Sequence, residues 1–185
     1  MNRSILLTLI LPNKNEVSIN EEIEEMILLA KTLGYNVIES ITQKRNKIDP
    51  ATYFGKGKII NLIEKCELLD IKTIFINDEI EPSFYKNIVK ICKKKIMIID
   101  RTKLILDIFN LHAKTNEAKK QIELASLEYL LPRLVGQWTH LERQMGGTGT
   151  RGGPGEKQIE IDRRLVRKSI DRLKSDLINI KKQHY

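Results

Sequence analysis

The sequence predicts an α/β fold, with a small parallel sheet and flanking helices, followed by a long antiparallel helical hairpin with a glycine-rich tip. Three observations support this prediction. Short apolar runs alternate with helical patterns over residues 1–100, no strand pattern follows them, and six of the ten residues 146–155 are glycine. Short, continuously apolar strands separated by helices are typical of β-α-β units with a parallel sheet. We therefore expect a small α/β domain over residues 1–100 and a helical hairpin arm over residues 101–185, with the glycine-rich loop at 146–155.

Four apolar runs are the expected strands of the first domain, at residues 4–11, 35–42, 72–78 and 94–100. Helical patterns separate them at residues 18–34, 55–70 and 82–94. In the first helix, Ser18 and Glu21 stand at the spacing of a capping box, and Gly34 marks the expected end. Pro82 opens the third helix, where its fixed backbone angle suits a first turn.

The arm is expected to consist of two helices that pack along each other. Residues 101–134 have a helical pattern with a break expected near Leu111, and a second helix starts at Gly155 or Glu156. Its apolar residues recur at spacings of 7, 4, 3, 4 and 3, at Ile159, Val166, Ile170, Leu173, Leu177 and Ile180. This a/d pattern is typical of a helix that packs along a partner. The preceding helix would face it with either Ala118, Ile122, Ala125 and Tyr129 or Leu124, Leu127 and Leu131.

The positive charge of the chain is concentrated in its last third. The whole chain has a formal net charge of +8, yet residues 1–100 carry 15 Lys and Arg against 14 Asp and Glu. Residues 133–185 carry 12 Lys and Arg against 6 Asp and Glu. A basic surplus around a glycine-rich segment favours a polyanion as the binding partner.

Other residue types argue against several functions. Cys66 and Cys92 lie far apart in apolar helical patterns, which favours buried free thiols and fits a reducing cytoplasm. No apolar stretch is long enough to span a membrane. His112 and His140 have no Cys or His neighbour at metal-ligand spacing, and no nucleophile arrangement is recognisable. We therefore expect neither a catalytic site nor a metal site in this segment.

The glycine-rich segment departs from a nucleotide P-loop. Glu156 separates Gly155 from Lys157, Gln158 stands where a hydroxyl is required, and the preceding element is helical. Arginine beside flexible backbone suits the irregular phosphates and unstacked bases of folded RNA, although any one side chain fits a structural role equally well. The candidate RNA-binding residues are Arg143, Gly146, Gly147, Gly149, Arg151, Gly152, Gly153, Gly155, Lys157, Arg163 and Arg164, and the flanking Arg133, Trp138 and His140 lie beside them.

Two other functions stay open on the residues alone. One is binding of a nucleotide, ATP or GTP, by the α/β domain. Gly55, Lys56, Gly57 and Lys58 follow a strand and could present amides and ammonium groups to phosphate, although a helix start with solvated lysines is the simpler interpretation. The other is an arm that pairs with another protein chain, which an exposed apolar stripe on the packed helices would support.

Residues 146–164, "GGTGTRGGPGEKQIEIDRR", resemble the signature that precedes the GTPase domain of the HflX-type GTP-binding proteins, a ribosome-associated family of GTPases. "DPATYFGKGKIINL" at 49–62 and "FINDEIEPSFYKNI" at 75–88 resemble its segments after the second and third strands. Residues 98–134 resemble its Asp-Arg-Thr, Ile-Leu-Asp-Ile-Phe and Glu-Leu-Ala elements in the same order.

The resemblance implies a function in translation. In this family the loop of the helical hairpin reaches into the large ribosomal subunit, and the protein splits or rescues stalled ribosomes, a response to stress. It implies the ribosome and large-subunit rRNA as partners, with the tip from Gly146 to Gly155, Arg143 and Arg151 as the contact. GTP and Mg²⁺ would belong to a GTPase domain absent from this chain, so no cofactor is expected in this segment. We expect a cytoplasmic protein and favour a monomer.

Overall fold

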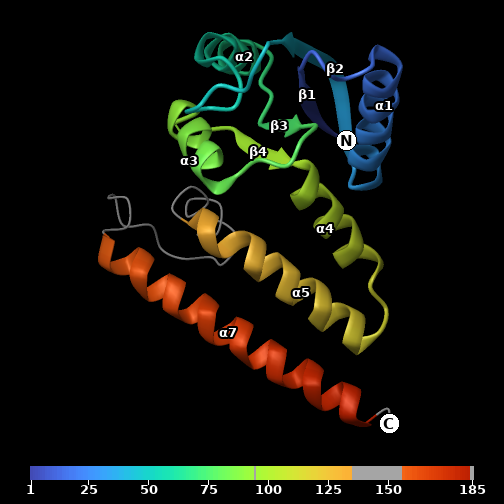
Figure 1. Cartoon of the computed structure of the whole chain (residues 1–185), viewed down its shortest axis with the longest axis vertical. Helices are drawn as coiled ribbons and strands as arrows, with labels where there is room; N and C mark the ends of the chain where they lie inside the picture. Colours follow the sequence, from blue (N-terminus) through green and yellow to red (C-terminus); the bar gives the residue numbers. More distant parts are fainter. Residues whose placement is uncertain (94, 135–155, 184–185) are drawn as a thin grey trace. The chain divides into compact units, whose positions relative to one another are not determined.

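The computed structural model describes residues 1–93, 95–134 and 156–183, and the chain divides into two compact units. The first unit, Met1–Ile108, contains a sheet with helices on both faces. The described part of the second unit, Phe109–Tyr185, is helical. Figure 1 follows the elements of both units along the chain.

The sheet of the first unit has four strands, all parallel. They are β1 (Asn2–Ile10), β2 (Tyr35–Lys44), β3 (Thr73–Ile76) and β4 (Met97–Asp100), in the order β2-β1-β3-β4. The predicted parallel α/β sheet is therefore confirmed. The pairing of β1 with β2 shifts register between Ser4 and Ile5, which leaves Ile38 without a partner in the ladder.

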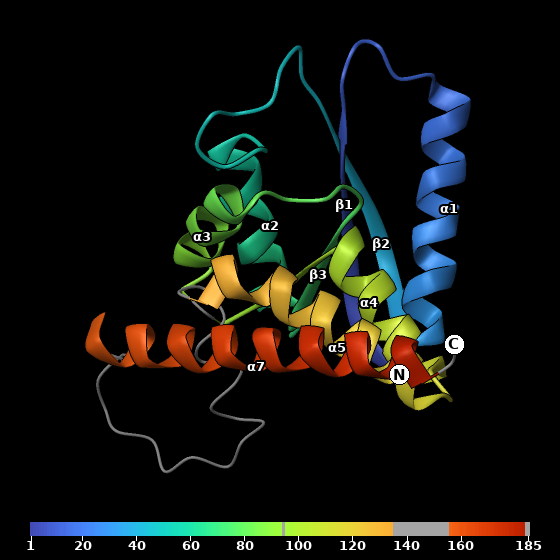
Figure 2. The ribbon, with the colours of Figure 1, turned by 60° about the horizontal axis from the view of Figure 1, so that its bottom comes forward.

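Helices cover both faces of this sheet. Figure 2 shows α1 (Glu16–Thr32) on one face and both α2 (Lys56–Leu68) and α3 (Pro82–Ile91) on the other. Side chains of a buried strand alternate between the two faces, so Leu7 and Ile76 join the core under α2 and α3, whereas Leu6 and Phe75 join the core under α1. Leu104, which is fully buried, adds the start of α4 (Arg101–His112) to the second of these cores.

The start of α1 differs from the predicted capping box. Asn15 is the N-cap, and its side-chain oxygen accepts a hydrogen bond of 3.1 Å from the Val17 N–H, so Ser18 and Glu21 lie inside the helix. Asn caps a helix as well as Ser, and Asn15 adds most of a turn to the helix. The predicted end is confirmed, because Leu33 is the C-cap and Gly34 follows with a φ of 80°. Pro82 is confirmed in the first turn of α3.

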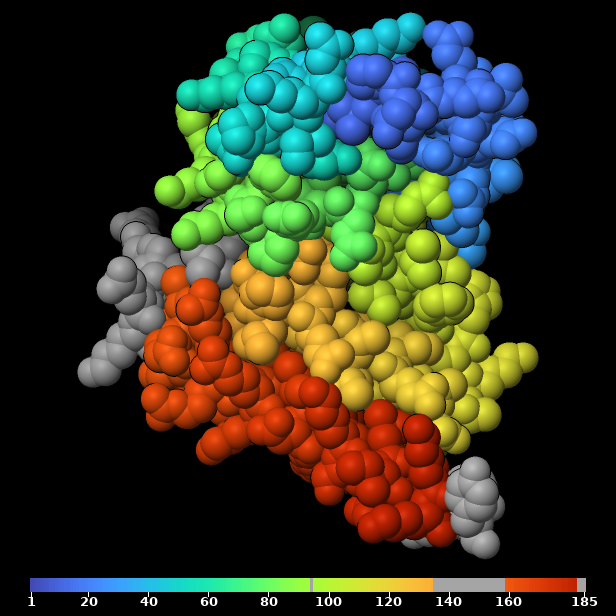
Figure 3. Space-filling model, viewed as in Figure 1, coloured from blue at the N-terminus to red at the C-terminus, as the bar shows by residue number. Residues whose placement is uncertain are grey.

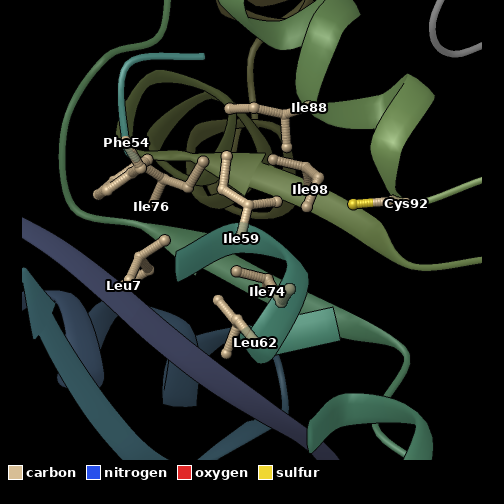
Figure 4. A pocket seen from close by; sticks show the side chains of 9 residues that line it. All are labelled: Leu7, Phe54, Ile59, Leu62, Ile74, Ile76, Ile88, Cys92 and Ile98. Carbon is tan, nitrogen blue, oxygen red and sulfur yellow. The ribbon is translucent and has the colours of Figure 1, made fainter. Parts of the chain in front are cut away.

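Both cysteines are buried free thiols, as predicted. Burial raises the pKa of Cys66 to about 11 and that of Cys92 to about 12. Figure 4 shows the Cys92 side chain among the residues that line a small pocket between the sheet, α2 and α3. Every lining residue is apolar or a cysteine: Leu7, Phe54, Ile59, Leu62, Ile74, Ile76, Ile88, Cys92 and Ile98. The pocket is therefore part of the core and offers no polar group to a ligand.

Asp100 and Arg101, at the junction of β4 and α4, connect several elements of the first unit. The Asp100 carboxylate accepts hydrogen bonds from the Ile80 N–H at 3.1 Å and the Lys103 N–H at 2.9 Å. The Arg101 guanidinium donates to both the backbone and the side-chain oxygen of Asn77, at 3.2 and 3.1 Å. It also donates to the Glu25 carboxylate at 2.9 Å, which joins α1 to the carboxyl end of the sheet.

The second unit contains α5 (Asn116–Leu130), a short 3-10 helix η1 (Leu131–Arg133) and α7 (Glu156–Gln183). The helical segment predicted over residues 101–134 is interrupted between His112 and Asn116, which confirms the predicted break near Leu111. Thr115 caps α5, its hydroxyl oxygen accepting a hydrogen bond of 3.1 Å from the Ala118 N–H. Among the helices in the described parts of the chain, none is both long and apolar enough to cross a membrane.

Candidate nucleic-acid interface

The helices α5 and α7 pack against each other along the predicted apolar seam. Ile170 and Leu173 of α7 are each 7% exposed, and Tyr129 of α5 is 8% exposed. The other predicted seam residues, Ile159, Val166, Leu177 and Ile180, are half-buried. Figure 1 shows the two helices side by side, and Figure 3 shows their side chains in continuous contact. The a/d pattern therefore identified the side of α7 that packs on α5.

Ion pairs flank this seam. Lys120 of α5 bonds to the Asp176 carboxylate of α7, and Lys174 of α7 lies 2.9 Å from the Glu128 carboxylate of α5. The hydrogen bond from Lys120 holds the pKa of Asp176 below its usual range. Such pairs contribute little free energy at an exposed surface, so the buried apolar seam decides which faces of the two helices meet.

The predicted antiparallel hairpin with a glycine-rich tip is not confirmed, because residues 135–155 lie outside the described residues. Most of the predicted RNA-binding residues, namely Arg143, Gly146, Gly147, Gly149, Arg151, Gly152, Gly153 and Gly155, lie outside the described residues, as do Trp138 and His140. Lys157 lies in the first turn of α7. Arg163 is half-buried and Arg164 is exposed on the same helix. The tip and its contacts therefore stay predictions.

Arg133 has a structural environment. It is 6% exposed, and its guanidinium lies 3.8 Å from the centre of the Tyr129 ring, a cation–π contact. Its Nη1 also donates a hydrogen bond of 2.9 Å to the Tyr129 carbonyl oxygen. Arg133 therefore holds the end of α5 to η1 and is not a surface cation beside the glycine-rich segment.

The sequence prediction missed two exposed cations of α7. Lys168 and Arg172 follow Arg164 at intervals of four residues, and all three side chains are exposed. Residues four apart lie on one face of a helix, so the spacing was a usable signal. It needed the seam as a reference, because a row of cations becomes a surface only when the buried side of the helix is known.

The segment predicted as an alternative phosphate site forms the start of α2. Gly55 is the N-cap, and its N–H already donates a hydrogen bond of 2.9 Å to the Gln43 side-chain oxygen. A Cβ atom at Gly55 would lie 2.6 Å from Nη1 of Arg45, so this side chain covers the turn closely. Lys56 and Gly57 are exposed and Lys58 is half-buried. The Gly55 amide is thus engaged within the protein rather than presented to a ligand.

The described residues form neither a metal site nor a long apolar stripe. Among them, no three His, Cys, Asp or Glu side chains come close enough together to hold a metal ion. A protein-interaction arm would need an apolar stripe along the outer side of α7. Ile161 and Leu165, 42% and 57% exposed, are neighbours one turn apart, but Ser169, Arg172 and Asn179 follow where a stripe would continue.

Comparison with known proteins identifies the class of protein to which this chain belongs. Residues 20–110 match the family model of the N-terminal region of GTP-binding GTPases, and residues 112–185 match the model of their middle region. The two matches meet at the end of α4, where the two compact units also divide. The chain therefore comprises the regions that these two models describe.

Within this class the chain belongs to the HflX family. It is 45% identical over 181 residues to the GTPase HflX of Flavobacterium psychrophilum, covering 98% of this chain and 43% of that relative. It is 40% identical over 163 residues to the GTPase HflX of Escherichia coli, covering 88% of this chain and 38% of that relative. The chain thus spans less than half the length of these curated relatives.

Solved structures agree with the assignment. A GTP-binding protein of the hyperthermophilic archaeon Sulfolobus solfataricus, crystallised with GDP, matches with a TM-score of 0.65 and 26% identity. That match covers 98% of this chain and 46% of the archaeal chain. A structure described as the complex of SsGBP and GDP matches with a TM-score of 0.69 and 25% identity, over 98% of this chain and 44% of that one.

Proposed function

We propose that this chain is the ribosome-binding N-terminal region of an HflX GTPase, and that it contacts rRNA of the large subunit. In this proposal α5 and α7 form an antiparallel hairpin whose glycine-rich tip, residues 146–155, enters the RNA. The whole protein would split or rescue stalled ribosomes in the cytoplasm under stress. GTP and Mg²⁺ would bind to the GTPase part, which is outside this chain.

The observation that carries the proposal is the charge of the helical unit. The helices α5 and α7 pack through an apolar seam, so their polar residues are left for solvent or a partner. Residues 133–185 hold a surplus of six positive charges, whereas residues 1–100 hold a surplus of one. A basic helical pair that flanks a glycine-rich segment suits a folded RNA, whose phosphates are closely spaced and whose surface is irregular.

Co-sedimentation with separated ribosomal subunits tests the proposal. We expect the chain to sediment with large subunits at low salt and to dissociate as salt is raised, because neutralised phosphates release counterions. Changing both Arg143→Ala and Arg151→Ala should weaken this binding at least tenfold while the chain stays folded. Equal binding to small and large subunits, or failure of the intact chain to bind either, would contradict the proposal.

A further inference from the structure

Three exposed cations form a row on the side of α7 that faces away from its seam. Lys168 stands two residues before the buried Ile170 and Arg172 stands two residues after it. At about 100° per residue, each lies roughly 200° around the helix from Ile170. Arg164 lies one turn before Lys168 on the same face. We call Arg164, Lys168 and Arg172 the outer row.

We propose that the outer row binds the phosphate backbone of RNA without reading its sequence. This inference rests on the proposed function and adds to it a second contact surface, separate from the glycine-rich tip. The row is built on a regular helix held by packing, so its charges keep a fixed spacing of about 6 Å per step. Repeated negative charges along a nucleic-acid strand are the partner that such a row fits.

The outer row keeps its charge available for a partner. Within residues 159–182, the Glu160 carboxylate lies 4.0 Å from Arg167, and Asp176 is bonded to Lys120 of α5. Neither Arg164 nor Lys168 makes an ion pair with another residue in the described part of the chain. Arg172 lies near enough to Asp176 to help lower its pKa, after the larger effect of Lys120. Asp171 is the one carboxylate on the border of the row, so the row stays positive.

The composition of this face favours RNA over the other polyanionic partners. A helix that lies on an anionic membrane presents a continuous apolar face to the lipid, whereas the apolar seam of α7 is used against α5 and, among the described residues, only Ile161 and Leu165 are exposed apolar residues beside the outer row. Two of the three cations are arginines, whose planar guanidinium forms paired hydrogen bonds with phosphate oxygens. Contacts of this kind position a protein on nucleic acid and carry no base information.

The test compares two variants with the same change of charge. The row variant carries Arg164→Gln, Lys168→Gln and Arg172→Gln. The control variant carries Lys31→Gln, Lys86→Gln and Lys90→Gln, three exposed lysines of the first unit. Dissociation constants are measured from about 50 to about 200 mM salt with large ribosomal subunits and with RNA duplexes of two unrelated sequences. Circular dichroism confirms that each variant is folded.

For the row variant we expect the slope of log K against log salt to fall by about 2 to 3, since each lost phosphate contact removes about 0.7 to 0.9. Affinity should fall at least tenfold at low salt, equally for both duplex sequences, and the control variant should keep the slope of the natural chain. If the row variant is unfolded, Lys168→Glu alone serves as the test, with an expected fall of at least threefold.

Each of the other outcomes either supports or overturns the proposal about the outer row. An unchanged slope in the row variant, with the natural chain still bound to large subunits, overturns the proposal that the outer row binds RNA and leaves the proposed function standing. Equal losses in the row and control variants overturn it as well, since they indicate a general effect of charge. Vesicles of anionic phospholipid are tested as a further ligand. If the row variant loses binding to these vesicles and keeps its binding to RNA, the outer row is a membrane-binding surface and the proposal is overturned. RNA binding that depends on the row, with no binding to large subunits, supports the row and contradicts the proposed function.

Discussion

At the scale of single residues, the Arg101 guanidinium joins three elements of the first unit. It donates to both oxygens of Asn77 and to the Glu25 carboxylate, and its Nη2 also lies 3.3 Å from the Glu22 carbonyl oxygen. A planar guanidinium reaches these separate acceptors at once, which the single ammonium of lysine does not.

We expect Arg101→Ala to lower the free energy of unfolding by about 2 kcal/mol, because Asn77 is buried and its two oxygens would lose the Arg101 donor. Arg101→Lys should recover less than half of this loss. Urea unfolding followed by circular dichroism measures both. Arg3→Ala is the control, since Arg3 makes one exposed hydrogen bond to the Leu69 carbonyl oxygen and its loss should cost less than about 0.5 kcal/mol. Similar losses for Arg3→Ala and Arg101→Ala would refute the assigned role.

The two buried thiols predict a dependence on pH. Burial raises the pKa of Cys66 to about 11 and that of Cys92 to about 12, whereas an unfolded cysteine titrates near 8.5. Above about pH 8.5 the unfolded chain therefore loses these protons before the folded chain does. The stabilisation is complete below the unfolded pKa, and it declines as pH rises toward 11 and 12.

Thiol labelling with a chromogenic disulfide reagent checks this prediction. In the folded chain we expect both cysteines to stay unmodified between pH 7 and pH 9, and both to react at once in denaturant. Stability measured by urea should decrease from pH 8 to pH 10, and Cys66→Ala with Cys92→Ala should make the decrease smaller. Rapid labelling of the folded protein at pH 7 would show that the thiols are accessible.

At the scale of elements, the seam of α7 makes a matched pair of substitutions possible. Ile170 is 7% exposed and Ile178 is 54% exposed on the same helix. Ile170→Ala should lower the free energy of unfolding by about 2 to 4 kcal/mol through lost burial and the cavity that remains. Ile178→Ala should cost less than about 1 kcal/mol, because Ala is the better helix former and little burial is lost. Thermal unfolding ranks the two, and a reversed order would contradict the assignment of the seam.

Much of this architecture could be predicted from sequence, for local reasons. Central strands such as β1 and β3 are buried on both faces, so they read as unbroken apolar runs, and the seam of α7 repeats every three or four residues. The start of α1 was missed because Asn15 and Ser18 are equally good caps, and local preference does not choose between them. The partners of Arg101 could not be predicted, since Glu25 is 76 positions away in the chain.

The candidate site was harder to predict than the fold. A basic surplus is visible in composition, but the side of a helix on which each cation lies depends on which side is buried. Arg133 illustrates this, because its position beside the glycine-rich segment suggested a surface cation, and packing against Tyr129 places it inside. Lys168 and Arg172 could have been recognised from their spacing relative to the predicted seam residue Ile170, and the burial of Ile170 now fixes the side of the helix on which they lie.

At the scale of the whole molecule, the two units predict different responses to ligands. The sheet domain is nearly neutral, its turn at Gly55 is covered by the side chains of Gln43 and Arg45, and the pocket in its core is apolar. We therefore expect neither ATP nor GTP with Mg²⁺ to change the melting temperature of this chain. A ligand present at 100 times its dissociation constant would add about 2.7 kcal/mol. For a chain of this size that corresponds to roughly 5 to 10 °C.

Differential scanning fluorimetry at low salt makes the comparison, with an RNA duplex as the second ligand. RNA should raise the melting temperature of the helical unit in a salt-dependent way, whereas the nucleotides should leave the transition unchanged. A nucleotide shift of several degrees that Lys56→Ala and Lys58→Ala remove would establish the phosphate site at the start of α2. In that case the sheet domain would bind nucleotide in its own right.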